Sequence, residues 1–387
     1  MSPFRAAAGA AGLRLWAIPS VTAASHDAPL GERAMKFGML HLFENPDERT
    51  EHEIVSDQLD IIQAAEDVGF DSVWPAEHHF SEYGYCPSPA LTLAAISRVT
   101  TKVRLGTGVV VLPFHDPIRV AEEYAFLDLM SDGRLDFGVG RGYQPIEFKG
   151  HRVDQTKSRG IFRESLEIIT QAWTEERVTY DGQFFQIDDV WVRPKPLQQP
   201  HPPIWMAAVS PETYPLAGKL GANLLYAPVF TPEGRPMLDR LDAYRGALEE
   251  SGHDPATKRI AALRMIYVAD SMEQARREFT DPVIWYYRTF GKYVTTPKDE
   301  PPIPGYENYG ATRDLAVDVD FQTLVDAGTV IAGTPDYVCE QIEKLEDDWG
   351  FTDLLCWTRL GGMETSQVMR SMELMERHVI PHFNEKE

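Results

Sequence analysis

Short apolar runs alternate with longer amphipathic segments from Met35 almost to the end of the chain, and this alternation constrains the fold more than any other feature. We predict eight strands, at residues 37–42, 71–74, 103–112, 134–140, 203–208, 222–226, 260–268 and 353–357. A helical segment follows each strand, which implies parallel pairing and an α/β fold. Eight such units in about 350 residues fit a (β/α)8 TIM barrel, with an open, doubly wound sheet as the alternative.

Local signals mark several helix starts and two insertions. Thr50-Glu51-His52-Glu53 fits a capping box, in which the first and fourth residues satisfy each other's backbone N–H groups. Asp116-Pro117 combines an N-cap with a proline at the first helical position. Residues 178–196 are predicted to form an inserted β-hairpin. Residues 291–327 are rich in proline, glycine and acidic residues and show no clear element.

The first 34 residues differ from the rest. They are rich in alanine and glycine and contain no acidic residue before Asp27. A signal peptide is one interpretation, but Arg14 interrupts the apolar stretch and the basic start consists of Arg5 alone. We therefore expect residues 1–34 to be a poorly ordered extension. Because no linker divides the remainder, residues 35–387 are predicted to form a single domain.

Composition excludes several classes of partner. The chain carries 37 Lys and Arg residues against 59 Asp and Glu residues, a formal net charge of −22, which argues against nucleic acid and anionic membrane surfaces. No stretch approaches the ~18–20 apolar residues of a transmembrane helix. Cys86, Cys339 and Cys356 are far apart and form no metal-type spacing, so we expect a cytoplasmic protein without a disulfide scaffold.

Functional side chains of a barrel lie where strands end and the following loops begin. Histidine and aromatic residues crowd these positions, which predicts a pocket for a flat, partly apolar ligand. The stretches concerned are His41 to Phe43, Glu77-His78-His79-Phe80, Phe114-His115-Asp116, Arg141-Gly142-Tyr143-Gln144 and Ser210-Pro211-Glu212-Thr213.

Two of these positions suggest an anion site. Ser210 is a good N-cap, Pro211 suits the first helical position and Thr213 lies in the first turn, so the helix start offers free backbone N–H groups. Arg141 ends the neighbouring strand, and its guanidinium matches a phosphate. The alternative is that Ser210 merely caps the helix and Arg141 pairs with an acidic residue. Spacing alone leaves both interpretations open.

Two further motifs are weaker. Gly138-Val139-Gly140-Arg141-Gly142 departs from the dinucleotide fingerprint, because its third glycine comes too early, Pro145 follows and we expect no helix to start directly. Glu77-His78-His79 could be metal ligands, but adjacent residues on an extended strand end point to opposite sides, so we expect no metal. An acid/base histidine over a bound ligand, or a histidine satisfied in the core, are the other interpretations.

Several segments, in this order, resemble the luciferase-like flavin monooxygenases, the family that includes bacterial luciferase. The segments are Met35-Lys36-Phe37-Gly38, residues 69–74, Glu77-His78-His79-Phe80, residues 105–113, residues 127–134, residues 137–142 and Gly333-Thr334-Pro335. The resemblance covers nearly all of residues 35–383. It implies a (β/α)8 barrel that uses reduced FMN and O2. In this family a C4a-peroxyflavin oxygenates a small organic substrate such as an aldehyde or a ketone.

The resemblance also implies roles for individual residues. His78 matches the histidine that supports the oxygenation chemistry, and Trp285 matches an aromatic residue that lines the flavin pocket. Gly108-Val109 matches a cis peptide under the flavin ring. The positions that hold the flavin phosphate are matched by Arg141, Val209, Ser210 and Thr213. Residues 291–327 fall where the family has a mobile lid.

Three departures distinguish the chain from bacterial luciferase. Gly140 replaces a reactive cysteine, Val209 replaces an acidic residue and Gln144 replaces a tyrosine, so light emission and a long-chain aldehyde substrate are not expected. With no dinucleotide fingerprint, a separate NAD(P)H:flavin reductase is the expected partner, and the resemblance implies a homodimer. Hydride transfer with a deazaflavin coenzyme is the alternative function, and an inactive flavin-binding protein is a third.

Overall fold

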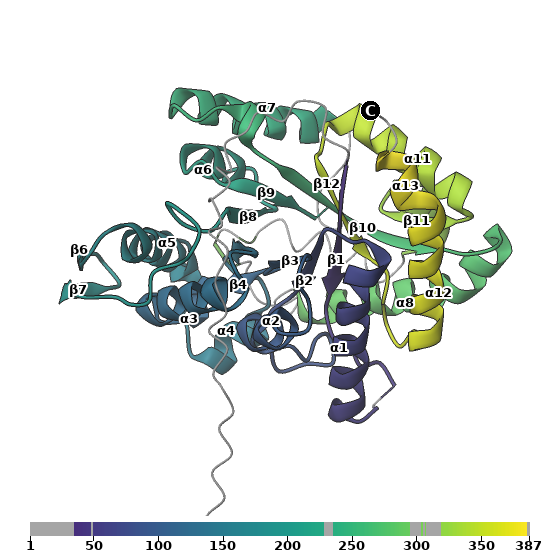
Figure 1. Cartoon of the computed structure of the whole chain (residues 1–387), viewed down its shortest axis with the longest axis horizontal. Coiled ribbons are helices and arrows are strands. Elements are labelled where there is room, and N and C mark those ends of the chain that lie inside the picture. Colours follow the sequence, from purple (N-terminus) through teal and green to yellow (C-terminus); the bar gives the residue numbers. More distant parts are fainter. Residues whose placement is uncertain are drawn as a thin grey trace, which may run out of the picture.

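The computed structural model describes residues 35–47, 49–227, 235–294, 303–304, 306 and 319–384. The predicted extension at residues 1–34 and most of the predicted lid at 291–327 therefore lie outside the described residues. Figure 1 shows strands in the middle of the molecule with helices around them. Within the described ranges, no helix combines the length and the apolar composition that crossing a membrane requires.

The strands form a closed parallel barrel, which confirms the predicted (β/α)8 architecture. Around the barrel the order is β1 (Lys36–His41), β2 (Ser72–Pro75), β3 (Arg104–Gly106) with β4 (Val110–Val111), β5 (Leu135–Gly140), β8 (Ile204–Ala208), β9 (Asn223–Tyr226), β10 (Ile260–Val268) and β12 (Asp353–Trp357). β10 pairs with both β9 and β12, and β12 pairs back with β1, so the ring closes.

The structure corrects the predicted strands in two places. The third predicted strand, 103–112, is interrupted after Gly106, and the peptide bond between Gly108 and Val109 is cis. An additional strand, β11 (Val330–Gly333), was not predicted. It pairs with Met265–Val268, the last part of β10, and lies outside the eight-stranded ring.

Helices follow the strands as predicted, with short additions. The bounds are α1 (Glu51–Val68), α2 (Pro89–Ser97), α3 (Pro117–Met130), α4 (Pro145–His151), α5 (Ser158–Thr174), α6 (Thr213–Lys219), α7 (Arg235–Glu250), α8 (Met272–Tyr293), α10 (Phe321–Asp326), α11 (Pro335–Trp349), α12 (Thr365–Leu374) and α13 (Ile380–Asn384). Both sides of the Thr50–Glu53 capping box are present, and Asp116 accepts from Arg119 N–H as an N-cap. Of these helices, α4 and α10 were not predicted, and neither was α13, because the last helix was expected to span 363–378.

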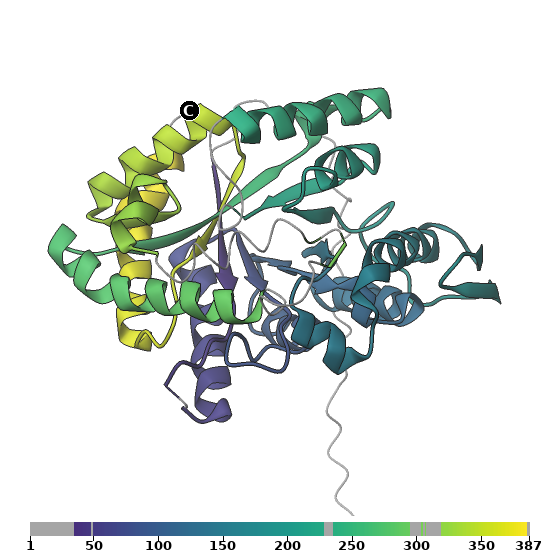
Figure 2. The ribbon, with the colours of Figure 1, turned by 180° about the vertical axis from the view of Figure 1, so that it is seen from behind.

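Two peripheral features complete the fold. The predicted hairpin is present as the antiparallel pair β6 (Val178–Asp181) and β7 (Gln186–Val190), at one end of the molecule in Figure 1. Seen from behind in Figure 2, the green helix α8 runs along the outside of the barrel beside the yellow C-terminal helices. That position brings one face of α8 toward the carboxyl ends of the neighbouring strands.

Tryptophan side chains fill part of the barrel interior. Trp74 and Trp205 meet edge to face, with ring centroids 5.4 Å apart, and both are almost fully buried. Gly106 leaves room for Trp74, because a Cβ at this position would lie 2.2 Å from the indole ring. Trp74 Nε1 donates to Ser72 Oγ at 2.8 Å, so the buried indole N–H is satisfied. The interior is thus occupied around these rings, and open space remains beyond them.

Candidate active site

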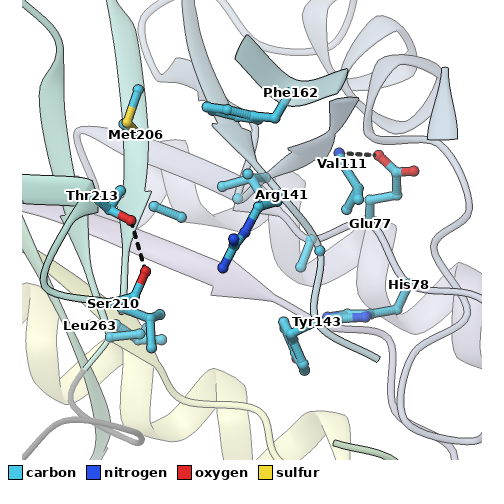
Figure 3. A pocket seen from close by; sticks show the side chains of 18 of the residues that line it. Glu77, His78, Val111, Arg141, Tyr143, Phe162, Met206, Ser210, Thr213 and Leu263 are labelled. Atoms are coloured by element: carbon cyan, nitrogen blue, oxygen red, sulfur yellow. Dashed lines mark hydrogen bonds between the residues drawn. The ribbon is translucent and has the colours of Figure 1, made fainter. Parts of the chain in front are cut away.

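A cavity of about 220 Å³ lies at the carboxyl ends of the barrel strands (Figure 3). Its wall is largely apolar and aromatic, with a few polar groups at defined places. Seven of the eight predicted site residues line it: His78, Gly108, Val109, Arg141, Val209, Ser210 and Thr213. This composition is typical of a pocket that orients an apolar ligand through a small number of polar contacts.

His78 follows β2 and points into the cavity toward Tyr143 in Figure 3. Its Nδ1 lies 2.9 Å from Oε1 of the buried Glu147. Because a carboxylate only accepts hydrogen bonds, Nδ1 carries the proton, which leaves Nε2 as an acceptor. The same Glu147 oxygen accepts from His79 N–H at 3.0 Å, which fixes the carboxylate in place. The pair has the arrangement of a base and the group that orients it.

Glu147 is one of the site residues that the sequence analysis missed, together with Tyr83 and Tyr286. It lies on α4, which begins at Pro145 directly after the glycine-rich turn, so the expectation that no helix starts there was wrong. Pro145 occupies the first helical position and Glu147 lies in the first turn, where a negative charge is favoured. Pro145 and Glu147 were the sequence signals from which the start of α4 could have been predicted. They were overlooked because α4 has only seven residues.

Glycine backbone lines the cavity beside the cis peptide. A Cβ at Gly140 would lie 2.5 Å from Cγ2 of Val109, and one at Gly108 would lie 3.0 Å from Cδ1 of Leu40. The cis bond between Gly108 and Val109, suggested by the resemblance, is present. The close approach of the two strands therefore requires glycine at 140 and leaves backbone exposed to the cavity.

A cationic group and two hydroxyls also line the cavity. Figure 3 shows Arg141 reaching between the Ser210–Thr213 pair and the side of the cavity formed by His78 and Tyr143. Ser210 Oγ and Thr213 Oγ1 are 3.1 Å apart. The guanidinium of Arg141 lies over the ring of Tyr306, 4.5 Å from its centroid. A guanidinium and adjacent hydroxyls can together bind the oxygens of a phosphate.

The predicted helix start near Ser210 needs a correction. Helix α6 begins at Thr213, two residues later than the proline was expected to place it, and Glu212 occupies the N-cap position. The Ser210 side chain contacts the Thr213 hydroxyl and caps no backbone N–H that is recorded for α6. Ser210 and Thr213 therefore contribute hydroxyl groups to the cavity wall.

Trp285 is the predicted site residue that does not line the cavity. Its neighbour Tyr286 lines it instead. Successive residues of an α-helix are rotated by about 100°, so only one of the two can face inward. The ring of Trp285 lies near Gly361, where a Cβ would be 2.9 Å from it.

The other histidines near the rim form a structural network. Glu77 Oε1 accepts from Nε2 of His79 at 3.0 Å and of His115 at 2.7 Å, and Oε2 accepts from Val111 N–H at 2.8 Å. Burial alone raises the pKa of the Glu77 carboxyl, but these hydrogen bonds outweigh it and the pKa lies below its usual value. His41 instead bonds Gln58 on α1. In the part of the chain that the structure describes, no group of three or more acidic, histidine or cysteine residues is arranged to hold a metal ion.

Comparison with known proteins agrees with this geometry. The profile of the family described as luciferase-like monooxygenase matches residues 35–353. The chain belongs to this family. It is 29% identical to the oxygenase component of a flavin-dependent trigonelline monooxygenase from Acinetobacter baylyi, over 91% of this chain and 96% of that protein. It is 28% identical to the alkanal monooxygenase alpha chain of the Kryptophanaron alfredi symbiont, over 91% and 99%.

Among solved structures, a monooxygenase from Streptomyces bottropensis superposes with a TM-score of 0.79 at 29% identity, covering 90% of this chain and all of that one. The match to this family of monooxygenases therefore covers most of the chain. The family resemblance stated from the sequence is confirmed, as is the barrel that it implied.

Proposed function

We propose that this protein is the oxygenase of a two-component, FMN-dependent monooxygenase system. A separate NAD(P)H:flavin reductase would supply reduced FMN, and the substrate would be a small organic compound such as an aldehyde or a ketone. The observation that carries the proposal is one cavity that holds the His78–Glu147 pair, the Arg141 guanidinium and an exposed glycine backbone. The printed name of the Acinetobacter relative, an oxygenase component, supports the division into two proteins.

The residues present fit FMN. Arg141, Ser210 and Thr213 would bind its phosphate, and the open backbone at Gly108 and Gly140 would let a planar ring lie against the strands. When bound, reduced FMN supplies the two electrons that convert one oxygen atom of O2 to water while the other is transferred to the substrate. Apolar side chains from the strand ends, among them those of Leu40, Met206 and Leu263, would exclude water from the ring.

His78 would contribute by taking up a proton and later returning it. Its Nε2 faces the cavity side of the ring as an acceptor, because Glu147 holds the proton on Nδ1. Nε2 can therefore take a proton from the substrate side and later return it. The buried Glu147 carboxylate, 2.9 Å from Nδ1, stabilises the imidazolium while it exists.

The test is a flavin titration followed by an oxygen measurement. We expect the fluorescence of FMN to change on binding with a lower Kd than that of riboflavin, which lacks the phosphate. We expect O2 uptake when a flavin reductase, NADH and a panel of aldehydes and ketones are added. Turnover with a reduced deazaflavin coenzyme and no O2 uptake with FMN would instead establish the alternative function. The absence of binding to either coenzyme would overturn the proposal.

We also propose that the protein is a homodimer. Helices α2 and α3 pack side by side, and large apolar side chains remain exposed on or beside them: Leu91 (74% exposed), Val99 (54%), Phe126 (58%) and Leu129 (39%). Exposed apolar residues gathered on neighbouring helices suit burial against a second copy. Light scattering on the protein as it elutes from a size-exclusion column should give a mass of twice the 43.7 kDa of the chain.

A cytoplasmic location is proposed from the cysteines. Cys86, Cys339 and Cys356 are all buried, and none of them forms a disulfide within the part of the chain that the structure describes. Free thiols throughout a chain suit a reducing compartment. Fractionation of the native host should place the protein with the cytoplasmic fraction.

A further inference from the structure

Three tyrosine hydroxyls meet in the wall of the cavity beside His78. Tyr143 follows β5 and its hydroxyl donates to the Tyr83 hydroxyl at 3.0 Å. The Tyr83 hydroxyl also lies 2.9 Å from that of Tyr286, which comes from α8. All three residues line the cavity. The rings of Tyr83 and Tyr143 stand edge-on to the His78 imidazole, with centroids 4.7 Å and 5.8 Å away.

The three tyrosine hydroxyls have one more proton than their mutual hydrogen bonds use. Each hydroxyl carries one proton, and the two contacts between the three oxygens use two of them. The Tyr143 proton is used in the hydrogen bond to the Tyr83 hydroxyl. The remaining O–H therefore belongs to Tyr286 if Tyr83 donates to Tyr286, and to Tyr83 if the direction is reversed. In both arrangements the remaining donor sits on a residue that lines the cavity.

The hydroxyls of Tyr83 and Tyr286 stay protonated at neutral pH. Burial raises the pKa of Tyr83 well above its usual value, and the neighbouring phenols raise it further. Burial likewise raises the pKa of Tyr286. The remaining O–H is thus a neutral, buried donor, and a buried donor without an acceptor is costly. A ligand with a neutral acceptor oxygen would satisfy it.

The surroundings of the hydroxyls select a ring-shaped apolar body. Tyr286 packs edge-on against Trp357, with ring centroids 4.4 Å apart, and Trp357 also lines the cavity. The ring of Phe290 packs against the Tyr286 ring, with centroids 5.9 Å apart, and supports it. Aromatic faces and edges pack well against planar or alicyclic rings. A charged substrate group would need a cation. Of the two arginines that line the cavity, Arg141 is assigned to the cofactor phosphate and Arg159 pairs with Glu212.

We propose that the tyrosine triad of Tyr83, Tyr143 and Tyr286 binds the carbonyl oxygen of a cyclic or aromatic ketone or aldehyde and positions it beside His78. This inference rests on the proposed function, because it assigns the substrate end of the same cavity. The triad consists of substrate-binding and positioning residues. It would hold the carbonyl group at a fixed place relative to His78 Nε2, where a proton is taken up and returned.

A matched pair of probes separates this role from a structural one. Acetophenone carries the carbonyl oxygen, and ethylbenzene has the same ring with a methylene group in its place. Their Kd values are measured by calorimetry on the FMN-saturated protein and on the double variant Tyr83→Phe/Tyr286→Phe, which lacks both possible donors. Tyr244→Phe is the control, because it removes a buried hydroxyl that bonds the Ala222 carbonyl oxygen at 2.8 Å, outside the cavity.

We expect the double variant to bind acetophenone about 2- to 10-fold more weakly, as the loss of one hydrogen bond predicts. Ethylbenzene should bind the variant no more weakly than it binds the parent protein, and Tyr244→Phe should change neither value. If the double variant does not fold, the two single variants replace it, and the one that carries the remaining donor must show the selective loss.

Equal weakening of both probes, an unchanged Kd for acetophenone, or no binding of acetophenone to the parent protein would overturn the inference. The flavin titration is read separately. A protein that binds FMN without the selective loss retains the proposed function and loses the triad's role. A protein that binds no flavin fails the proposed function itself.

Discussion

The pH dependence of stability offers a sharp test of the groups behind the cavity wall. Glu44 follows β1 and is fully buried, and neither of its carboxylate oxygens has a hydrogen-bond partner among the described residues. The nearest recorded cation is Arg359, whose Nη1 lies 3.9 Å from Oε2. Burial raises the pKa of Glu44 from 4.5 to about 7, although Arg359 opposes this shift. Burial also lowers the pKa of the nearby His41 from 6.5 to about 3.

The two shifts have opposite consequences for the free energy of unfolding. Glu44 keeps its proton in the folded state, so its contribution is complete below pH 4.5 and is lost as the pH rises through 7. The difference of 2.5 pH units corresponds to about 3 kcal/mol. His41 stays neutral in the folded state, so its contribution is present above pH 6.5 and is lost as the pH falls toward 3. Between pH 4.5 and 6.5 the two slopes cancel.

Replacement of Glu44 by glutamine removes the fall in unfolding free energy with pH that Glu44 causes. The opposite pH dependence caused by His41 then remains. Relative to the parent protein, Glu44→Gln should gain about 3 kcal/mol of unfolding free energy between pH 4.5 and pH 8. Urea unfolding followed by circular dichroism at half-unit pH steps measures this difference. Glu249→Gln, at an exposed position on α7, is the control and should follow the parent protein at every pH. A difference that does not change with pH would show that Glu44 is ionised and paired with Arg359, and would refute the reasoning.

Three further predictions concern the cavity and the barrel. Glu147→Gln should lower kcat by about 10²–10⁴-fold while the Kd for FMN stays unchanged, because it removes the charge that supports a protonated His78; stopped-flow product formation and a flavin titration check this. Arg141→Ala should raise the Kd for FMN by about 10- to 100-fold but leave that for riboflavin within about 2-fold, since only FMN offers a phosphate. Gly106→Ala should lower the unfolding free energy by about 1–3 kcal/mol, because its Cβ would lie 2.2 Å from the Trp74 ring; an unchanged thermal midpoint would contradict this.

Most elements of the fold could be predicted from the sequence, including the four-residue strands β2 and β9, but some short ones could not. β10 is nine residues long and was predicted at its observed bounds, because its apolar run exceeds what a loop carries. β11 and α4 have four and seven residues, too few for a periodic pattern to stand out. Such elements form because neighbouring segments supply hydrogen bonds and burial. β11, for example, exists as an extension of the last four residues of β10.

The candidate site divides in the same way. Residues at strand ends were predictable, because barrel closure brings all eight ends to one rim whatever the loops do. Positions in the interior of a long helix such as α8 were not, because a helix turns by about 100° per residue and nothing local fixes its phase. The resemblance therefore pointed to Trp285, while the packing of α8 places Tyr286 in the cavity wall.

The contacts around His78 show how the rim of the barrel holds this side chain in place. The imidazole forms a hydrogen bond to Glu147 through Nδ1 and packs edge-on against the rings of Tyr83 and Tyr143. Those rings are themselves tied to α8 through the hydroxyl of Tyr286. These contacts come from the loop after β2, the segment after β5 and helix α8, so no single loop sets the position of the imidazole. Because buried aromatic rings pack at near-crystalline density, the ring has little room to move. The packing of the rim and α8 therefore fixes where the His78 ring lies relative to the three tyrosine hydroxyls, as the proposed acid/base role of His78 would require.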